Sequence, residues 1–427
     1  MGILNTNISI INNFLSNFKE LFSKKQFSVF VLTIYSLLAE YKRNCLSSMA
    51  ENINLDYQRL QYFFSESRWD LDALNNKRLK IIENQRTTKS TDNGILAIDD
   101  TSVPKPYAKD TEGAHYQHCS SLKREEVCNV AVVSAFSSIS KYFPINLKSY
   151  MPEAEFTRGK NDYMFKSKIT LAKELVNDAV SKDINFSHIC FDSWYTSVDF
   201  IEFIDSKNLK LIAELKSNRL INFYHPVKRR HCFIKQDELV KLIRSLYPHK
   251  LKPVVITQPN GYRRDYLCYS FKSELKDCSV KVKVVVVFGK FINEDSKSIH
   301  VLITNDLNSY NHTIVAKYTL RWGIERTFKE LKDVFCFDQY QVRHKKQIQR
   351  YWMLCFIAWS LVYWIKQNGY LNKTLSCRLT SFNDYKKALN SLLLLGTGIS
   401  ISKNSASVCA QYGLKSNRMK KALGLAA

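Results

Sequence analysis

The stretch Lys317–Lys332, KYTLRWGIERTFKELK, limits the fold and the chemistry of this chain more than any other. It contains no Pro and one Gly, and strong helix formers fill its second half, so it is predicted to be a helix. Tyr318, Arg321, Glu325 and Lys332 then share one face, within an arc of about 60°. From the spacing alone, a solvated salt-bridge face is the ordinary alternative to a functional site.

Two short apolar runs that end in aspartate favour the functional interpretation. They are Ile95–Thr101 (ILAIDDT) and His188–Tyr195 (HICFDSWY). Each is typical of a buried strand that carries a carboxylate at its tip. In the first run, Asp99 and Asp100 would point to opposite faces of the strand. We favour Asp99, because it directly follows an apolar run and is followed two positions later by a hydroxyl; Asp100 remains the alternative.

The net charge of the chain indicates a polyanionic partner. Its 427 residues include 63 Lys and Arg against 39 Asp and Glu, a formal charge of +24. A hydrophobic content of 45% indicates a folded protein, and the length allows about two to four domains. Nucleic acid is the first candidate for the partner and an anionic membrane surface the second, while a basic surface kept for solubility is the alternative.

Several other classes of protein are disfavoured by the same sequence. The 11 Cys contain no CxxC pair, which indicates reduced thiols in a cytosolic protein. His115 and His118 form an HxxH without further zinc ligands at the usual spacing, so we interpret them as ordinary polar residues. No signal peptide is evident. The longest apolar run, Tyr351–Ile365, is short for a membrane span and predicts a buried helix.

Residues 1–90 are predicted to be helical. Phe27–Tyr41 is a strongly apolar helix, and Leu46–Asn52 and Leu55–Phe64 are two short helices around a turn. This pair resembles a helix-turn-helix, although a helical hairpin without a role in DNA binding fits equally well. In a helix-turn-helix the second helix would offer four side chains to a major groove: Tyr57, Gln58, Arg59 and Gln61.

From Gly94 the sequence pattern changes to strands. Five strands are predicted, with helices at 163–180 and 198–206 on either side of the fourth. The strands are Ile95–Asp99, Val127–Phe136, Phe143–Tyr150, His188–Asp192 and Leu209–Glu214. This order is expected of a ribonuclease-H-like α/β core, a mixed five-stranded sheet with flanking helices.

A β-rich insertion is predicted after this core. Its apolar runs lie at 253–257, 266–271 and 280–288, and Ser298–Thr304 then returns to the core. Tyr351–Ile365 and Asp384–Leu395 are further helices, and the tail from Ser402 is polar and basic. The predicted domains are a helical DNA-end-binding domain at 1–90, a catalytic core at 91–215 and 298–345, a β-rich insertion at 216–297, and a helical C-terminal region at 346–427.

Asp99, Asp192 and Glu325 are the predicted catalytic residues and metal ligands. Two carboxylates at strand tips and one on a helix face can together bind two divalent cations, and such hard oxygen ligands suit Mg²⁺ or Mn²⁺. Two such ions can activate a water or a 3′-hydroxyl and stabilise the leaving oxygen during in-line attack on a phosphodiester. The carboxylates are far apart in the sequence, so the fold has to assemble the site.

The spacing Tyr318-x2-Arg321-x3-Glu325-x6-Lys332 resembles the signature of a known family. It matches, position for position, the DDE transposases of bacterial insertion sequences, in the group numbered four and its near relatives. This signature is specific when two Asp motifs precede it in the chain.

Both Asp motifs are present. Asp99-x-Thr101 resembles the first motif of that group, and Asp192-Ser-Trp-Tyr195 resembles the second. The resemblance covers roughly residues 90–345, including a long gap before the Glu helix in which that group places a β-rich insertion. The segment from Phe63 to Asp70 resembles the end-binding region of the family more loosely.

The resemblance implies a ribonuclease-H-like catalytic domain that binds two Mg²⁺ or Mn²⁺ ions through the three carboxylates. Tyr318, Arg321 and Lys332 would hold the DNA strand near the cut, the cations at phosphates and the tyrosine by hydrogen bonding or stacking. Trp194 or Trp322 would be able to stack on a flipped base, but we interpret both as buried aromatic residues.

We therefore expect a transposase that binds terminal inverted repeats and catalyses metal-dependent DNA cleavage and strand transfer. Its partners would be transposon ends and target DNA, with a homodimer in the synaptic complex, in the bacterial cytoplasm at the nucleoid and not at a membrane. The alternatives are a catalytically inactive DNA-binding derivative and a metal-dependent nuclease without strand transfer.

Overall fold

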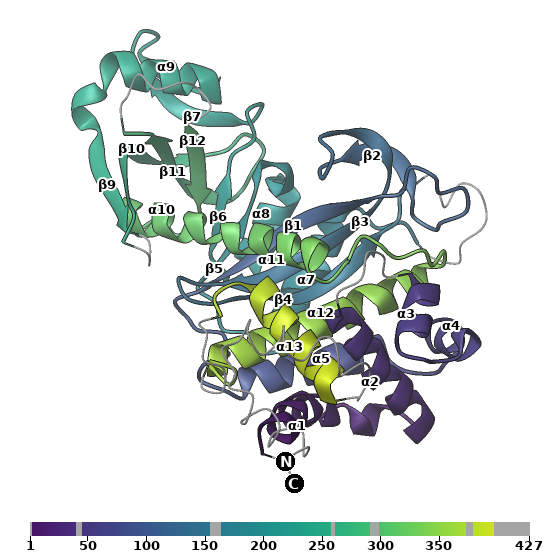
Figure 1. The fold of residues 1–427 in the computed structure, drawn as a ribbon. Helices are drawn as coiled ribbons and strands as arrows, with labels where there is room; N and C mark the ends of the chain where they lie inside the picture. The colour runs from purple at the N-terminus through teal and green to yellow at the C-terminus, as the bar shows by residue number, and fades with distance from the viewer. Residues whose placement is uncertain are drawn as a thin grey trace. The chain divides into compact units, whose positions relative to one another are not determined.

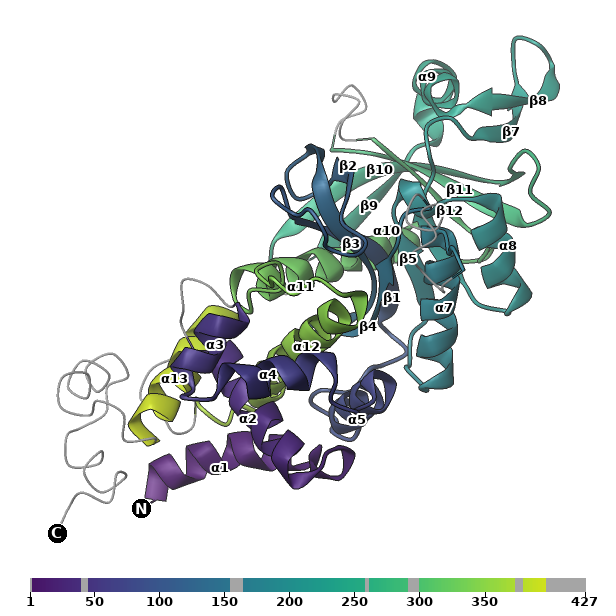
Figure 2. The ribbon, with the colours of Figure 1, turned by 90° about the vertical axis from the view of Figure 1, so that its right-hand side faces the viewer.

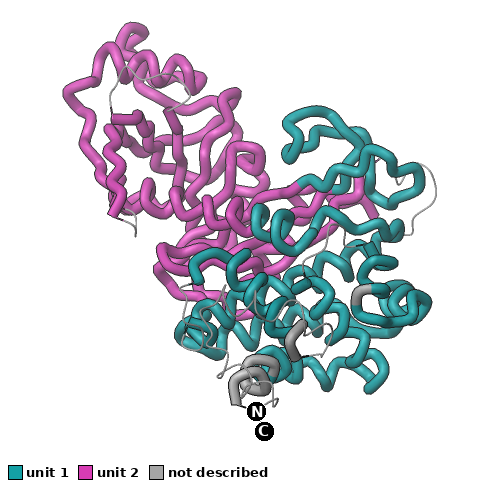
Figure 3. The backbone as a smooth tube through the Cα atoms, in the orientation of Figure 1, with its two compact units in different colours: residues 1–89, 102–129, 328–427 teal, residues 90–101, 130–327 magenta. Residues whose placement is uncertain are grey.

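The computed structural model of this chain divides into two compact units (Figure 3). Unit 1 consists of Met1–Lys89, Ser102–Asn129 and Phe328–Ala427, and unit 2 of Ser90–Thr101 and Val130–Thr327. The structure describes residues 2–39, 45–153, 164–257, 261–290, 299–372 and 379–396. Each unit is assembled from segments that lie far apart in the sequence.

Unit 2 is a mixed α/β structure organised around a sheet (Figure 1). The strands that lie wholly or partly in this unit are β1 (Ile95–Pro104), β3 (Arg124–Ser137), β4 (Tyr142–Tyr150), β5 (His188–Phe191), β6 (Leu211–Glu214), β9 (Lys252–Thr257), β10 (Arg263–Glu274), β11 (Lys281–Phe288) and β12 (His300–Thr304). Their order in the sheet is β4-β3-β1-β5-β6-β12-β11-β10-β9. β5 is parallel to both β1 and β6, whereas the pairs from β6 to β9 are antiparallel.

The five strands predicted for the core are present as β1, β3, β4, β5 and β6. The prediction that the sheet has only these five strands is wrong. β12 pairs with the free edge of β6, and β11, β10 and β9 extend the sheet beyond β12 in that order. Each added strand presents unpaired backbone N–H and C=O groups, to which the next strand can bond. The three runs predicted to be β-rich are β9, β10 and β11. The predicted domain limits at 90, 215, 298 and 345 remain a prediction.

Helices cover both faces of the sheet in unit 2. Figure 2 shows α7 (Lys168–Ser181) and α8 (Val198–Ser206) on one face and α10 (Asn311–Leu320) on the other. The central strands β1, β5 and β6 accordingly begin with runs of buried residues, as expected of strands covered on both sides. The helix predicted to begin at residue 163 begins at Lys168, and residue 163 itself lies outside the described residues.

One part of unit 2 was not predicted from the sequence. β7 (Leu220–His225) and β8 (Arg230–Lys235) form a separate two-stranded sheet, and α9 (Gln236–Leu246) follows directly. α9 has two acidic residues in its first turn and buries Leu239 and Ile243, one helical turn apart. The basic residues around this segment obscured that short apolar pattern.

Unit 1 is built around α12 (Lys345–Asn368), whose side chains from Arg350 to Ile365 are all buried. This confirms the buried helix predicted from the apolar run. The helices described with it are α1 (Gly2–Ser16), α2 (Lys24–Leu38), α3 (Leu46–Asn52), α4 (Tyr57–Ser65), α5 (Leu71–Glu83) and α13 (Phe382–Gly396), and α12 packs against α2, α4, α5 and α13. β2 (His115–Cys119) pairs with the start of β3.

Among the described residues, no helix has the length and apolar character needed to span a bilayer. The predicted end of the apolar helix at Tyr41 and the predicted polar tail from Ser402 lie outside the described residues.

The helix predicted for 317–332 is interrupted at Arg321. α10 ends at Leu320 and α11 (Trp322–Asp333) begins after it. The break has a tertiary cause, because the Ser137 hydroxyl at the end of β3 donates a hydrogen bond of 2.7 Å to the carbonyl of Leu320. Bonds from Arg321 N to Tyr318 O and from Ile324 N to Arg321 O tighten the chain to a three-residue spacing here.

Candidate active site

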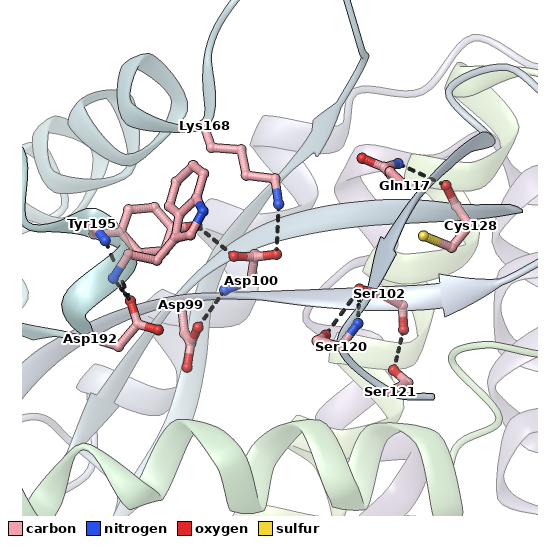
Figure 4. Close-up of polar contacts among 11 residues, drawn as sticks. Asp99, Asp100, Ser102, Gln117, Ser120, Ser121, Cys128, Lys168, Asp192 and Tyr195 are labelled. Carbon is pink, nitrogen blue, oxygen red and sulfur yellow. Dashed lines mark hydrogen bonds and ion pairs between the residues drawn. The ribbon is translucent and has the colours of Figure 1, made fainter. Parts of the chain in front are cut away.

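Two aspartates lie side by side on neighbouring strands in unit 2 (Figure 4). β1 and β5 are parallel with Ile98 opposite Phe191, so Asp99 on β1 lies beside Asp192, which directly follows β5. Parallel pairing thus brings together carboxylates from two runs that are distant in the sequence. The prediction that the first strand ends at Asp99 is wrong, because β1 continues through Asp99 to Pro104.

Arg321, at the break between α10 and α11, joins the first aspartate to the glutamate. Its Nη1 lies 2.9 Å from Asp99 Oδ2 and 3.3 Å from Glu325 Oε1. The side chains of Arg321 and Asp99 are largely buried, whereas that of Glu325 is 40% exposed. Four of the predicted site residues, from three segments of the chain, thus meet in unit 2.

Burial and neighbouring carboxylates raise the pKa of Asp99. Burial is the main cause of the high pKa of Asp99, about 8, and the negative charges of Asp192, Asp100 and Glu325 add to it although Arg321 opposes them. Burial also raises the pKa of Asp192. The site therefore holds more negative charge than one guanidinium neutralises, which is the electrostatic condition of a cation-binding site.

The backbone fixes the orientation of Asp192. Its Oδ1 accepts hydrogen bonds from the backbone N–H groups of Trp194 and Tyr195, at 3.0 and 3.4 Å, so that it caps the short helical turn Ser193–Tyr195. These bonds lower its pKa and partly offset burial. A carboxylate held in this way keeps its second oxygen available for another partner.

Asp100 has different partners from Asp99. Its Oδ2 lies 3.0 Å from Lys168 Nζ, and its Oδ1 accepts a hydrogen bond of 3.2 Å from the Tyr195 hydroxyl. Figure 4 shows both contacts, on the side of β1 away from Asp99. Asp99, and not Asp100, has the bond to Arg321. The choice of Asp99 as the first metal ligand remains a prediction that this geometry favours.

Glu214 is a fourth carboxylate, which the sequence analysis did not include. It ends β6, and it accepts hydrogen bonds from the hydroxyl of Tyr318 at 3.0 Å and, at 2.8 Å, from Nδ1 of His300. Burial tends to raise its pKa, but the bonds to His300 and Tyr318 and the charge of Arg321 leave it lowered. The signal was available, because Leu209–Glu214 is a third apolar run that ends in an acid.

The two remaining residues of the predicted DNA-binding set lie in unit 1. Lys332 Nζ donates to the carbonyl of Ser102 at 2.9 Å and to the hydroxyl of Ser121 at 2.6 Å. Arg59 is exposed on α4, one turn before the buried Phe63. Of the four side chains expected on the outer face of that helix, all are exposed. Their roles in DNA binding remain predictions.

The interpretation of Trp194 and Trp322 as buried aromatic residues is wrong. Their side chains are 47% and 62% exposed. Trp194 belongs to the short helical turn that Asp192 caps, and Trp322 is the first residue of α11.

The donor set suits a hard divalent cation, since it consists of carboxylate oxygens that are partly buried and mutually repulsive. In the residues that the structure describes, no group of three or more His, Cys, Asp or Glu side chains is closed around a metal position. Instead the guanidinium of Arg321 supplies the positive charge between Asp99 and Glu325. The chemistry of these residues fits a metal.

We expect the Asp99→Asn variant to be more stable than the wild type at pH 8 in EDTA. The pKa of Asp99 rises from its usual 3.8 to about 8 on folding, so the folded protein binds the proton more tightly. The free energy of unfolding of the wild type therefore decreases as the pH rises from about 4 to about 8. The variant has no titrating carboxyl at this position, so its free energy of unfolding does not decrease for this reason. Thermal unfolding between pH 5 and 8.5 measures the effect. Asp199→Asn, on the exposed side of α8, is the control, and a variant advantage that grows toward low pH would contradict the assignment.

Gly323 allows α11 to approach the end of β3 closely. A Cβ at this position would lie 2.1 Å from Ser137 Oγ, 2.7 Å from Ser137 Cβ and 3.2 Å from Tyr142 Cβ. Rotation of the serine hydroxyl cannot relieve the contact with its Cβ. We expect Gly323→Ala to lower the free energy of unfolding by about 1–2 kcal/mol, because overpacking outweighs the gain in helix propensity.

A double-mutant cycle with Ser137→Gly isolates this contact. Chemical denaturation of the single and double variants should show that Gly323→Ala costs much less in the Ser137→Gly background. Additive losses would mean that Gly323 acts through some other neighbour.

Two protein-family models match the chain. The model described as DDE superfamily endonuclease matches residues 17–231, and the model described as Transposase DDE domain matches residues 166–361. Between them the matched regions contain Asp99, Asp192 and Glu325.

The sequence is also similar to a curated relative, the probable transposase for insertion sequence element IS701 of Microchaete diplosiphon. The two are 25% identical over 246 residues, which are 56% of this chain and 62% of the relative. The match thus spans less than two thirds of that relative's length.

Two transposase complexes are among the solved structures that are similar to this chain. A piggyBac transposase synaptic complex with hairpin DNA has a TM-score of 0.46 and 12% identity, over 97% of this chain and 82% of that one. The Drosophila P element transposase strand transfer complex has a TM-score of 0.22 and 10% identity, over 96% of both chains.

Proposed function

Because this chain belongs to the DDE superfamily of endonucleases, we propose that it is the transposase of an insertion sequence. It would bind the terminal inverted repeats and catalyse metal-dependent DNA cleavage and strand transfer. One observation carries the proposal: Asp99 on β1, Asp192 directly after β5 and Glu325 on α11, from three distant segments, lie around Arg321. The match to a transposase domain and the similarity to the IS701 relative support the same function.

We propose that the catalytic core is ribonuclease-H-like and is formed by residues 91–215 and 298–345. Its support is the order β4-β3-β1-β5-β6, in which β5 is parallel to both of its neighbours and helices cover both faces. Residues 216–297 would be the insertion, residues 1–90 the end-binding domain, and residues 346–427 the C-terminal region.

Asp99, Asp192 and Glu325 would hold two Mg²⁺ or Mn²⁺ ions. When bound, such ions supply an activated water or 3′-hydroxyl and charge stabilisation for in-line attack on a phosphodiester. The backbone bonds to Asp192 orient its carboxylate before DNA arrives. The Arg321 guanidinium limits the repulsion between Asp99 and Glu325, so the three acids can remain close together in the folded protein.

The cationic residues would position the DNA. Arg321 and Lys332 would contact phosphates near the cut, and Tyr318, whose hydroxyl is held by Glu214, would contact the same strand. Arg59 is exposed on α4, where it would face a terminal repeat. Two copies of the chain would pair the two transposon ends and a target DNA in a synaptic complex at the bacterial nucleoid.

Cleavage of a labelled duplex that carries the element's own end tests the proposal, with Mg²⁺ and with EDTA. We expect cutting at the end with Mg²⁺ and none with EDTA or in Asp192→Asn, which removes a ligand charge with little change of shape. The control is Asp199→Asn, because Asp199 forms only an exposed ion pair with Lys173.

The outcomes separate the candidate functions. Tight binding of the end without cutting by any divalent metal would indicate a catalytically inactive DNA-binding derivative. Cutting without joining of the 3′ end to a target would indicate a metal-dependent nuclease. Equal cutting by the wild type and Asp192→Asn would contradict the assigned site.

A further inference from the structure

We propose that the hairpin formed by β7 and β8 is a second DNA-binding surface of this protein, separate from the carboxylate site and from α4. We call residues 220–235 the ribbon. The proposal rests on the proposed function only in that the partner is DNA. It concerns duplex DNA bound through phosphates and a groove, with no role in the chemistry of cutting.

Positive charge is concentrated in the part of the chain that contains the ribbon. Residues 216–290 contain seventeen Lys and Arg but five Asp and Glu, a net charge of +12. This is half of the formal charge of +24, carried by less than a fifth of the chain. Such segregation is what a local electrostatic attraction to DNA requires, and solubility alone would not require it.

One face of the ribbon is used for folding. Ile221 lies opposite Ile234 and Phe223 opposite Cys232, and the side chains of Ile221, Phe223 and Ile234 are buried. The Phe223 ring lies 5.0 Å from that of Phe271 on β10. Figure 2 shows α9 beside β7 and β8, which agrees with its packing against both strands. The inner face is therefore already occupied.

The outer face carries side chains that suit nucleic acid. The period of two along a strand places Tyr224 opposite His231 and Asn222 opposite Phe233 on this face. Tyr224 and Phe233 are 47% and 45% exposed, and the rings of Tyr224 and His231 meet edge to face at 5.6 Å. Aromatic rings, an amide and an imidazole are thus arranged on one exposed strand pair.

The turn of the ribbon presents a basic tip, Lys228-Arg229-Arg230, and is itself ordered. His225 Nδ1 accepts a hydrogen bond of 3.3 Å from the backbone N–H of Lys228, and its Nε2 lies 3.3 Å from Glu238 Oε1. Arg229 has a φ of 50°, which completes the tight turn. Within the described residues neither Arg229 nor Arg230 forms an ion pair, so both charges are available to a ligand.

These features fit a duplex better than a protein surface. A two-stranded ribbon has the width to enter the major groove, where Arg and Lys at its tip reach phosphates on either side. The aromatic side chains of the outer face would then contact sugars or thymine methyl groups. The charge of +12 over residues 216–290 favours the regularly spaced phosphates of a duplex over a protein surface.

The test compares salt dependence of DNA binding in EDTA, where no cutting takes place. In the variant Lys228→Gln, Arg229→Gln, Arg230→Gln, we expect the slope of log affinity against log salt to become shallower by about two to three, since each phosphate contact contributes roughly 0.9. The matched control is Lys109→Gln, Lys207→Gln, Lys346→Gln, which removes the same charge from exposed positions outside the ribbon and outside residues 1–90.

Two results would overturn the proposal. One is a wild-type slope in the ribbon variant. The other is an equal change of slope in the control variant, which would mean that only the net charge of the protein matters. A charge-preserving variant, Arg229→Lys with Arg230→Lys, should keep the wild-type slope and shows that the change is not misfolding. The measurement uses the element's end and an unrelated duplex in parallel. A shallower slope with the element's end alone would assign the ribbon to the transposon DNA. A shallower slope with both duplexes would assign it to DNA of any sequence.

The result is independent of the catalytic proposal. If the wild type binds DNA through the ribbon but cuts nothing with any metal, the carboxylate assignment fails and the ribbon assignment stands. Single-turnover cutting at saturating DNA should be the same in the ribbon variant and the wild type.

Discussion

Glu325→Gln is expected to reduce DNA cleavage by at least about 10³-fold while DNA binding is retained. The substitution keeps the shape of the side chain but removes one of three negative charges, so the site would hold divalent metal less tightly. A loss of this size corresponds to about 4 kcal/mol of transition-state stabilisation, within the range that metal-held charge supplies. Single-turnover cutting of a labelled end, at several Mg²⁺ concentrations, measures it.

A second glutamate provides the matched control. Glu202 lies on α8 in the same unit and accepts hydrogen bonds from the backbone and hydroxyl of Ser279. Glu202→Gln should cut DNA at the wild-type rate. If Glu325→Gln retained cleavage within tenfold of the wild type, Glu325 would not be a ligand, and Glu214 would become the next candidate.

Arg350→Met is expected to lower the free energy of unfolding by about 3–5 kcal/mol. Arg350 is buried in unit 1, where its guanidinium lies 4.3 Å from the Trp69 ring. It donates hydrogen bonds to four backbone carbonyls of the segment that ends α4 and follows it: Phe63 at 3.2 Å, Phe64 at 3.0 Å, Ser67 at 2.6 Å and Trp69 at 3.2 Å. Methionine fills similar space but donates to none of these carbonyls. The Phe63 carbonyl keeps a bond of 2.9 Å from the Trp69 indole N–H, and the other three lose the bond from Arg350.

Urea denaturation followed by circular dichroism measures the loss of stability. Arg68→Met is the control. Arg68 lies between Ser67 and Trp69 in the anchored segment, but its side chain is exposed. Affinity for the element's end should fall as well, since the anchored segment fixes the end of α4, which carries Arg59. Unfolding at the wild-type urea concentration would mean that water or neighbouring donors replace the guanidinium.

The strands were predictable because they depend on local pattern. The apolar run that ends in an acid describes β5 correctly but covers only the buried first half of β1, which continues past Asp99 to Pro104. Parallel pairing then brings Asp99 and Asp192 together. The same rule applied to β6 would have included Glu214. The long apolar helix α12 was predictable for the same reason, since its apolar run exceeds what a half-exposed helix would carry.

The features that the sequence did not reveal depend on contacts between distant segments. The break at Arg321 follows from the Ser137 hydroxyl bonding to Leu320 and from the close approach of Gly323, neither of which leaves a local signal. Arg321 keeps helical dihedrals at this tightened turn, and its guanidinium contacts both Asp99 and Glu325. The growth of the sheet beyond β6 likewise depends on which edge β12 meets.

Three elements, β1, β3 and α11, begin in one compact unit and end in the other. As a ribosome makes this chain, the first 89 residues emerge long before α12, which buries them and supplies Arg350 to the end of α4. The N-terminal helices therefore lack this packing until residues 345–368 have been made. A chain that stops before residue 345 would lack that support, so premature termination should yield fragments for proteases and not a competing DNA-binding protein.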